Sequence, residues 1–365
     1  MTRLLRSPIP RWLTGWVFVT GGLLGCGSES DPLDARLQHE TPRASLLAVG
    51  DTGRPHRWFP ELFEGQIAVA NGMAAEDERE PVDALILLGD NFYDAGLVRE
   101  TMPDQIRQNL VYPYCRFVTL NGPRSEEVAG ACRDPGSQNH PTQILAVLGN
   151  HDLDTPGSAE LQCQEVGDFV SNWQMPCAFS KAVELGNGVS VILFSSENRP
   201  TAEQVQELEE AVRKTKGPWR VLASHRPIIM NDDSRPLPHG SWVNHMLARI
   251  DVPVHAFVSG HHHSLQLLET PGPGPYLHAI VGSGARARGR SPNATEHPAR
   301  RYGASQLGFG RIDVFGPDDD QRLVVSLFAT PDYPFLGGAH PRLVSRWSVD
   351  QNGNTRDELA TAESP

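Results

Sequence analysis

The sequence predicts an α/β domain in which two mixed β-sheets pack face to face with helices on their outer faces, a four-layer α/β/β/α sandwich. The main observation is a continuous apolar run that recurs five times, each time followed by Gly or Ser and a polar side chain. Continuous hydrophobicity is typical of strands buried on both faces. The intervals between the runs are long enough for crossover helices, and further apolar segments supply strands for a second sheet.

The ends of the five runs carry the candidate functional residues. The runs read SLLAVGD, ALILLGD, QILAVLGNH, RVLASH and HAFVSGHHH. Ligands of such sheets gather outside the carboxyl ends of the strands, so we expect the polar residues at these ends to meet in one crevice. They are Asp51, Asp90, Asn150 with His151, His225, and His261 to His263.

The clearest helix is predicted over Thr201 to Lys216, because Thr201 and Gln204 form a capping box and Gly217 follows. Weaker helical candidates are Trp58 to Ala74, Val98 to Tyr112, Ser158 to Trp173 and Trp242 to Ile250. A hairpin is expected over Lys181 to Ser195. Further strands are expected at Tyr276 to Val281, Gly310 to Phe315, Arg322 to Phe328 and Leu343 to Val349.

The charge balance argues against one class of partner. The chain has 365 residues, with 32 Lys plus Arg and 44 Asp plus Glu, which gives a formal net charge of −12. This sign does not suit a nucleic-acid partner held through phosphate contacts. A small anionic substrate would need local positive charge, which bound metal ions could supply.

The N-terminal segment resembles an export signal. A basic start precedes an apolar stretch, Trp12 to Leu24, which is shorter than the roughly 20 residues of a spanning helix. The LLGC that ends at Cys26 resembles a bacterial lipoprotein cleavage box. We therefore expect residues 1–25 to be removed and Cys26 to carry a lipid that anchors the protein in the periplasm or at the cell surface. An ordinary signal peptide with an incidental cysteine would instead give a secreted protein.

The remaining organisation follows from composition. Residues 26–42 are polar and punctuated by proline, which predicts a tether. The domain is expected to span residues 43–349, and the polar tail 350–365 is expected to be disordered.

Four cysteines lie within the domain, and an exported chain meets an oxidising compartment. Four cysteines allow three pairings. We favour the two local pairs, Cys115 with Cys132 and Cys163 with Cys177, because each closes a short polar loop. The spacing does not match a structural zinc site.

The run that ends at Asp90 has a second donor, Tyr93, three residues further on. A carboxylate has two oxygens and can bridge two cations, while a phenolate is a hard anionic donor that suits a trivalent ion. These two residues therefore predict a metal centre with an oxygen-rich half.

Taken together, the motifs resemble the metallophosphoesterase superfamily: GDTG at Gly50, GDNFY at Gly89, GNHD at Gly149, ASH at Ala223 and GHHHSLQ at Gly260. GDxxY in the second motif, with DxG in the first, is similar to the small, single-domain, tartrate-resistant purple acid phosphatases of the calcineurin-like superfamily. The match runs from about Leu46 to Phe315 with all five motifs in family order, which makes it far more specific than any one motif.

The resemblance implies a dinuclear centre in which Asp90 bridges Fe(III) and a divalent Zn, Fe or Mn ion. The implied ligands are, for Fe(III), Asp51, Tyr93 and His263, and, for the divalent ion, Asn150, His225 and His261. Two cations can clamp a phosphate ester and lower the pKa of a bound water until hydroxide attacks phosphorus. His151 resembles the histidine that protonates the leaving group, and His239 resembles a second substrate-facing histidine.

These implications predict an acid phosphatase that hydrolyses phosphate monoesters. One alternative is a metallophosphodiesterase with the same centre, since pocket width decides between the two. Another is a non-catalytic surface lipoprotein of the same fold, which would be expected to have lost ligands, and none of the seven is missing.

Two other features of the sequence bear on the site. Arginines at 286, 288, 290, 300 and 301 predict a solvated basic loop, with substrate contact as the alternative. Ser195 and Ser196 follow the strand VILF where the family usually has an acidic residue, which leaves the support of the metal ligands in question.

Overall fold

The computed structural model describes residues 40–53, 59, 62, 64–135, 142–228, 246–270, 275–288, 300–332 and 340–362. Several predictions lie outside these residues: the signal peptide 1–25, Cys26 and most of the tether, His239, and residues 242–245 of the helix expected over Trp242 to Ile250. Within the described ranges, no helix combines the length and the apolar character needed to cross a membrane.

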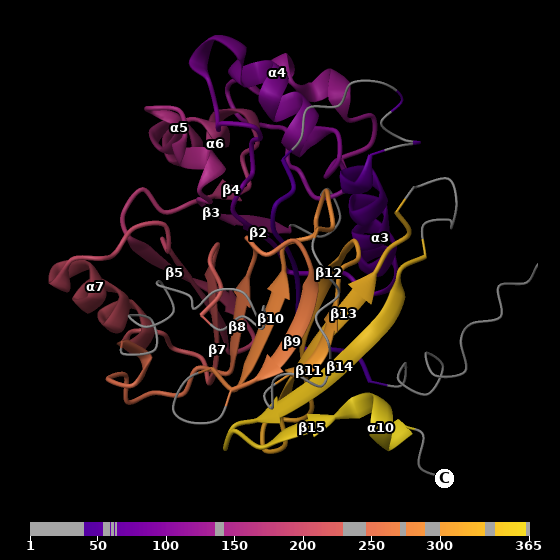
Figure 1. The fold of residues 1–365 in the computed structure, drawn as a ribbon, viewed down its shortest axis with the longest axis vertical. Coiled ribbons are helices and arrows are strands. Elements are labelled where there is room, and N and C mark those ends of the chain that lie inside the picture. The colour runs from indigo at the N-terminus through magenta and orange to yellow at the C-terminus, as the bar shows by residue number, and fades with distance from the viewer. Residues whose placement is uncertain are drawn as a thin grey trace, which may run out of the picture.

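Two mixed β-sheets form the centre of the molecule (Figure 1). The first has the strand order β15-β14-β13-β12-β1-β2-β3-β4, and the second has the order β11-β9-β10-β8-β7-β6-β5. The first sheet comprises β1 (Ala44–Val49), β2 (Ala84–Leu88), β3 (Gln143–Val147), β4 (Trp173–Gln174), β12 (Gly308–Phe315), β13 (Arg322–Ala329), β14 (Arg342–Asp350) and β15 (Thr355–Asp357). The second comprises β5 (Ser180–Gly186), β6 (Val189–Phe194), β7 (Trp219–Ser224), β8 (Ala256–Ser259), β9 (Leu265–Glu269), β10 (Leu277–Val281) and β11 (Arg300–Ala304).

Helices cover the outer faces of the sheets and join their strands (Figure 1). The α-helices are α3 (Gly65–Arg79), α4 (Met102–Ile106), α5 (Ser158–Gln164), α6 (Val166–Phe169), α7 (Ala202–Arg213) and α10 (Glu358–Ala362). Short 3₁₀ or π turns are η1 (Arg99–Thr101), η2 (Arg107–Val111), η3 (Ser125–Glu127), η4 (Ala129–Ala131) and η6 (His151–Leu153). In Figure 1, α7 lies on one side of the molecule and α4, α5 and α6 lie together at the top.

The burial of β1 shows how the layers arise. Leu46 and Ala48 pack into the apolar cluster between the two sheets. Leu47 and Val49, which point the opposite way, pack with Val69 of α3 in the cluster beneath the helices. A strand with two buried faces needs a continuous apolar run, because successive side chains alternate between the faces. The predicted four-layer sandwich is therefore confirmed.

The second sheet is covered by α7 on its outer face. Phe194 packs with Leu208 and Val212 of this helix in a third apolar cluster. The predicted capping box is present: Thr201 Oγ1 accepts from Gln204 N at 3.3 Å, and Gln204 Oε1 accepts from Thr201 N at 2.9 Å. This local sequence signal fixes where the helix begins.

Strand direction places the candidate site. In the first sheet, β1, β2 and β3 run parallel, with Val49 beside Leu87 and Leu87 beside Ala146. In the second sheet, β7 and β8 also run parallel, with Ala223 beside Val258. Within each sheet, the strands that precede the candidate residues are thus parallel neighbours whose carboxyl ends lie side by side.

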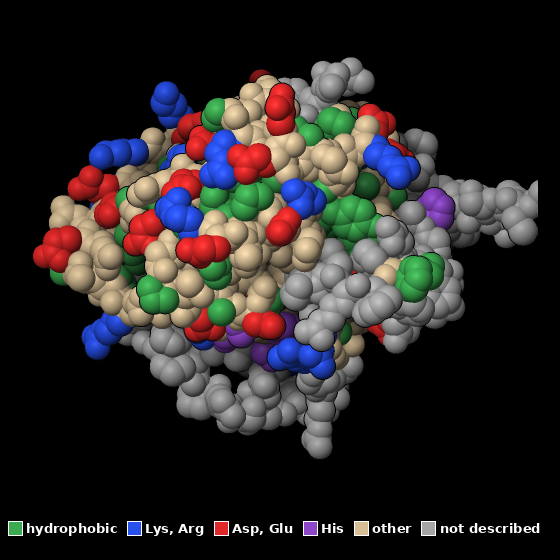
Figure 2. All heavy atoms as spheres, turned by 90° about the horizontal axis from the view of Figure 1, so that it is seen from above, with side chains coloured by type: hydrophobic (Ala, Val, Ile, Leu, Met, Phe, Trp, Pro, Cys, Tyr) green, Lys and Arg blue, Asp and Glu red, His purple; other side chains and the backbone are tan. Residues whose placement is uncertain are grey.

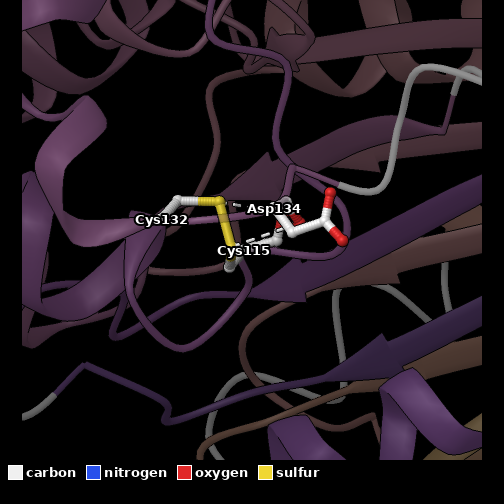
Figure 3. The surroundings of a disulfide bond; sticks show 3 residues. All are labelled: Cys115, Cys132 and Asp134. Atoms are coloured by element: carbon white, nitrogen blue, oxygen red, sulfur yellow. Dashed lines mark hydrogen bonds between the residues drawn. A yellow bond between two sulfur atoms is a disulfide. The ribbon is translucent and has the colours of Figure 1, made fainter.

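Both predicted disulfides are present. Cys115 bonds to Cys132, and Cys163 bonds to Cys177. The first bridge lies in a loop-rich segment, where the Cys115 sulfur is 3.5 Å from the carbonyl oxygen of Asp134 (Figure 3). Each bridge closes a loop of fewer than 20 residues, with separations of 17 and 14 positions.

The structure also corrects three sequence predictions. The helix expected over Ser158 to Trp173 divides into α5 and α6, and Trp173 begins β4 instead. Residues Arg300 and Arg301 belong to β11 and not to a loop. The tail is ordered over residues 355–362, because backbone pairing of β15 with the edge of β14 needs no apolar sequence.

Candidate metal centre

Each candidate ligand follows a parallel strand within a few residues. Asp51 and Asp90 lie two residues after β1 and β2, and Asn150 lies three residues after β3. From the second sheet, His225 follows β7 directly and His261 lies two residues after β8. The packed sheets therefore bring donors from both sheets to one edge, as expected for ligand sites at strand carboxyl ends.

The backbone is bent sharply at three of these positions. Asp51, Asp90 and His261 have φ angles of 56°, 52° and 63°, in the left-handed region that costs a residue with a Cβ about 1–2 kcal/mol. Close packing holds the bends in place: a Cβ added at Gly149 would lie 2.2 Å from Asp90 Oδ1. Strain of this kind collects at functional sites, where the surrounding structure can maintain it.

One half of the site is rich in oxygen. The Tyr93 hydroxyl lies 2.8 Å from Asp90 Oδ2 and 3.3 Å from Asp51 Oδ1. His263 Nε2 lies 3.3 Å from the same Asp51 oxygen. Four of the seven predicted donors are thus linked in a chain of contacts, each of 3.3 Å or less.

The other half is rich in nitrogen. His225 Nε2 lies 3.3 Å from Asn150 Oδ1 and 3.2 Å from His261 Nδ1. It also lies 3.7 Å from Asp90 Oδ1. Asp90 therefore presents Oδ2 to the oxygen-rich half and Oδ1 to the nitrogen-rich half, which is the arrangement a bridging carboxylate requires. Asp51, Asp90 and His225 have ligand atoms within 4.8 Å of one another.

The imidazoles are oriented as ligands. His225 Nδ1 donates to the carbonyl oxygen of Leu88 at 2.8 Å, and His263 Nδ1 donates to that of Arg286 at 3.0 Å. When Nδ1 carries the proton of a neutral ring, the lone pair is on Nε2, which in both residues faces the site. Such a bond on the outer nitrogen is usual for histidines that bind metals.

The electrostatics of the cluster fit bound cations. Asp51 and Asp90 are each 1% exposed. Burial raises the pKa of Asp51 to about 8, while the charge of His225 opposes this shift and that of Asp90 adds to it. Burial also raises the pKa of Tyr93, and the two carboxylates add to the increase. A cation among these groups would favour their ionised forms, so the donor set fits metal ions better than it fits protons alone.

The pKa values of His261 and His263 lead to the same conclusion, whereas that of His225 is shifted in the other direction. Burial lowers the pKa of His261 to about 2 and that of His263 to about 4. Burial also opposes charge on His225, but Asp51 and Asp90 outweigh it and raise the pKa of that ring. Neutral imidazole is the form that binds a metal.

Other predicted residues lie around the cluster. His151 lines the same pocket and stacks obliquely on Tyr93, with ring centroids 4.5 Å apart. His262 is directed elsewhere, with Nδ1 2.8 Å from Ser264 Oγ. His239 lies outside the described residues.

Sequence reasoning missed Asp152, which joins two motif loops. Its carboxylate is fully buried and accepts from the backbone N–H groups of Asn91 and Phe92 at 3.1 Å and of Gly149 at 2.9 Å. Gln162 Nε2 donates to it at 3.1 Å. Asp152 therefore fixes the loop of Asp90 relative to the loop of Asn150.

Sequence reasoning also missed a pair that contacts His261. Arg226 Nη1 lies 2.9 Å from His261 Nε2, and Arg226 Nε donates to Glu197 Oε2 at 3.0 Å. Ser196 Oγ accepts from Arg226 N at 2.8 Å. Glu197, one position after Ser196, therefore supplies an acidic group beside the site.

Two packed mixed sheets with a cluster of oxygen and nitrogen donors at their strand ends define a candidate metal centre. Residues 44–265, more than half of the chain, match the model of the calcineurin-like phosphoesterase family. The chain belongs to this family. The superfamily and the fold predicted from the sequence are confirmed, and membership implies hydrolysis of phosphate esters at a dinuclear metal centre.

Purple acid phosphatases are among its relatives. The chain is 25% identical to purple acid phosphatase 17 of Arabidopsis thaliana over 269 residues, which cover 67% of this chain and 69% of the relative. It is 23% identical to purple acid phosphatase 7 of the same plant over 287 residues, or 69% of this chain and 75% of the relative.

Solved structures share the fold. The purple acid phosphatase PPD1 of yellow lupin (Lupinus luteus) matches with a TM-score of 0.57 and 13% identity over 88% of this chain and 56% of its own. GAP50, described as the anchor in the inner membrane complex of Plasmodium, matches with a TM-score of 0.53 and 15% identity over 82% of this chain and 88% of its own.

Proposed function

We propose that this protein is an acid phosphatase that hydrolyses phosphate monoesters at an Fe(III) and divalent metal centre. The observation that carries the proposal is the geometry of Asp90, whose two oxygens face two different sets of donors. The oxygen-rich half, with Asp51, Tyr93 and His263, suits a trivalent ion, and the half with Asn150, His225 and His261 suits Zn, Fe or Mn in the divalent state. When bound, two such ions supply charge that neutralises phosphate oxygens and promotes ionisation of a water molecule.

The chain's own residues shape the rest of the reaction site. The pocket beside the donor cluster is lined by Asp51, Tyr93, His151 and His263. His151 is accessible from the pocket, and its Nδ1 lies 2.7 Å from the carbonyl oxygen of Asp94. A proton held on Nδ1 by this carbonyl leaves Nε2 as the atom that donates to a departing alkoxide when the ring is charged.

Asp154 lies beside His151. Its Oδ2 lies 3.4 Å from His151 Nδ1, an ion pair when the ring is protonated. The ring of Tyr93 packs against the same imidazole and restricts its rotation. His151 is therefore held beside the donor cluster in an orientation suited to general acid catalysis, which typically contributes 10²–10⁴-fold.

The experiment compares p-nitrophenyl phosphate with its bis ester at acidic and neutral pH. The proposal predicts a preference for the monoester, and Asp90→Ala and His225→Ala should abolish turnover while the circular dichroism spectrum stays similar. A strong diester preference would identify a metallophosphodiesterase. Undiminished turnover in both variants would show that the donor cluster does not act in hydrolysis, and absence of turnover in the wild-type protein would favour the non-catalytic lipoprotein.

We further propose that the protein is exported and anchored through a lipid on Cys26, with no contact with the membrane beyond that lipid. The two disulfides support this, because such bonds persist in oxidising compartments. Cys26→Ser should move the protein from the membrane fraction to the soluble fraction. An unchanged distribution would contradict the anchor.

A further inference from the structure

The loop after β10 forms one wall of the pocket at the donor cluster. Arg286 and Arg288 line this pocket together with Asp51, Tyr93 and His263. Both arginine side chains are exposed, and within the described part of the chain neither is paired with a carboxylate. Their composition predicted a solvated loop, but their position makes them part of the rim of the site.

Backbone contacts fix this loop relative to the metal ligands. The carbonyl oxygen of Arg286 accepts from His263 Nδ1 at 3.0 Å, and Arg288 N donates to the His263 carbonyl oxygen at 2.9 Å. Upstream, Gly284 N donates to the carbonyl oxygen of Gly50 at 3.1 Å. A Cβ added at Gly284 would lie 2.5 Å from that oxygen, so the loop lies directly against the turn before Asp51. These hydrogen bonds therefore fix the backbone positions of both arginines relative to His263.

The size of the pocket indicates which part of a substrate would lie next to the arginines. Its volume is about 100 Å³. Pockets that enclose a drug-sized ligand measure about 300–1,000 Å³. A half-open pocket of this size has room for a phosphate group, and a larger group esterified to it would extend onto the rim. The rim includes the exposed guanidinium groups of Arg286 and Arg288.

The charge of the rim is uneven. Asp94 lines the pocket beside His151, and Asp154 lies next to that histidine. Arg286 and Arg288 line the same pocket, and their loop contacts His263. Figure 2 shows Lys or Arg side chains directly beside a patch of histidine on the lower edge of the molecule. In a chain with a net charge of −12, this local positive charge would attract an anion.

We propose that Arg286 and Arg288 select phosphate monoesters whose leaving group carries a second anionic group, a carboxylate or another phosphate. The inference rests on the proposed function, because it concerns the ester that this site would cleave. The guanidinium groups form charge-assisted hydrogen bonds to the second anion, bidentate when the geometry allows. They determine specificity, while the phosphate that is transferred stays on the donor cluster.

The test uses three aryl esters that differ at one position: phenyl phosphate, 4-carboxyphenyl phosphate and 4-carbamoylphenyl phosphate. The carbamoyl ester is neutral at the position where the carboxyl ester is charged at pH 6. The wild-type holoenzyme should have a kcat/KM for the carboxyl ester at least about 5-fold above that for the carbamoyl ester, the scale expected for two exposed ion pairs. In the double variant Arg286→Ala, Arg288→Ala the ratio should fall to about 1.

Two controls make the result specific. Arg342→Ala removes an exposed arginine from β14 and should retain the wild-type ratio. Raising the salt concentration from about 0.05 M to 0.5 M should reduce the wild-type preference, because exposed charges are screened. A ratio that is the same in the wild-type protein and the double variant would overturn the proposal.

Binding is measured separately from turnover. Titration calorimetry with benzylphosphonate and 4-carboxybenzylphosphonate, which are not hydrolysed, should show the same 5-fold preference in the wild-type protein and its loss in the double variant. Equal affinities in both proteins would refute the role of the arginines. If phenyl phosphate is not hydrolysed although the phosphonates show the preference, the proposed function fails and the anion specificity stands.

Discussion

Asp152 gives the sharpest test of how the site is held together. Three buried backbone N–H groups, from Asn91, Phe92 and Gly149, donate to its carboxylate. Gln162 Nε2 is a fourth donor. A buried donor left without an acceptor costs about 1–3 kcal/mol. Asp152→Ala removes the acceptor from all four but leaves space that water can enter, so we expect a loss of about 3–5 kcal/mol in the free energy of unfolding.

The measurement is urea unfolding of the metal-free protein with both disulfides intact, followed by circular dichroism. Asp152→Asn keeps one acceptor oxygen, so its free energy of unfolding should fall by less than that of the alanine variant. Glu126→Ala, an exposed acidic residue on η3, should lie within about 0.5 kcal/mol of the wild type. If Asp152→Ala unfolded within 1 kcal/mol of the wild type, the view that this carboxylate joins the two loops would be wrong.

Three other predictions follow from the structure. Arg226→Lys removes the planar fork that holds the buried carboxylate of Glu197, so the free energy of unfolding measured with urea should fall by about 1–3 kcal/mol; an unchanged value would contradict this. Burial lowers the pKa of His278 from 6.5 to about 3, so its contribution to stability is complete above pH 6.5 and falls by about 1.4 kcal/mol per pH unit below it. In His278→Asn, the free energy of unfolding in urea should therefore fall less steeply as the pH is lowered below 6.5. An equally steep fall would show that this histidine does not cause the pH dependence. Replacing both Cys163 and Cys177 by serine should lower the free energy of unfolding in the same assay by about 3 kcal/mol. An unchanged value would show that the bridge does not stabilise the fold.

The features that the sequence predicted well are carried by local patterns. Asp51 and Asp90 each follow a short apolar run and a glycine, and that order of residues is enough to predict a donor at a strand end. The helix at Thr201 and the bridge between Cys115 and Cys132 likewise depend on residues close in the chain. Their convergence was predictable because parallel strands align their carboxyl ends.

The features that the sequence did not reveal depend on contacts between distant segments. Glu197 and Arg226 lie on separate strand ends, and only the packing of β6 beside β7 brings them together. Arg286 and Arg288 lie in a glycine-rich loop whose direction is set by hydrogen bonds to His263. Side-chain pattern alone does not encode such contacts, because each depends on the position of a second element.

The pairing of β15 with β14 eluded prediction for a related reason. Its residues are polar, and polar tails are commonly disordered. The strand forms because the backbone of Thr355 to Asp357 pairs with the edge strand β14 at Trp347 to Val349. Backbone hydrogen bonding is independent of side-chain hydrophobicity, so composition gave no signal.

The central claim is that seven side chains from two sheets hold a pair of metal ions around Asp90. The most direct measurement is the metal content of the purified protein by mass spectrometry, recorded together with its visible absorption spectrum. The account predicts two metal ions per chain, one of them iron, and an absorption band that disappears in Tyr93→Phe while iron remains bound. A wild-type protein that retains fewer than one ion per chain after reconstitution, or a band that persists in the phenylalanine variant, would contradict it.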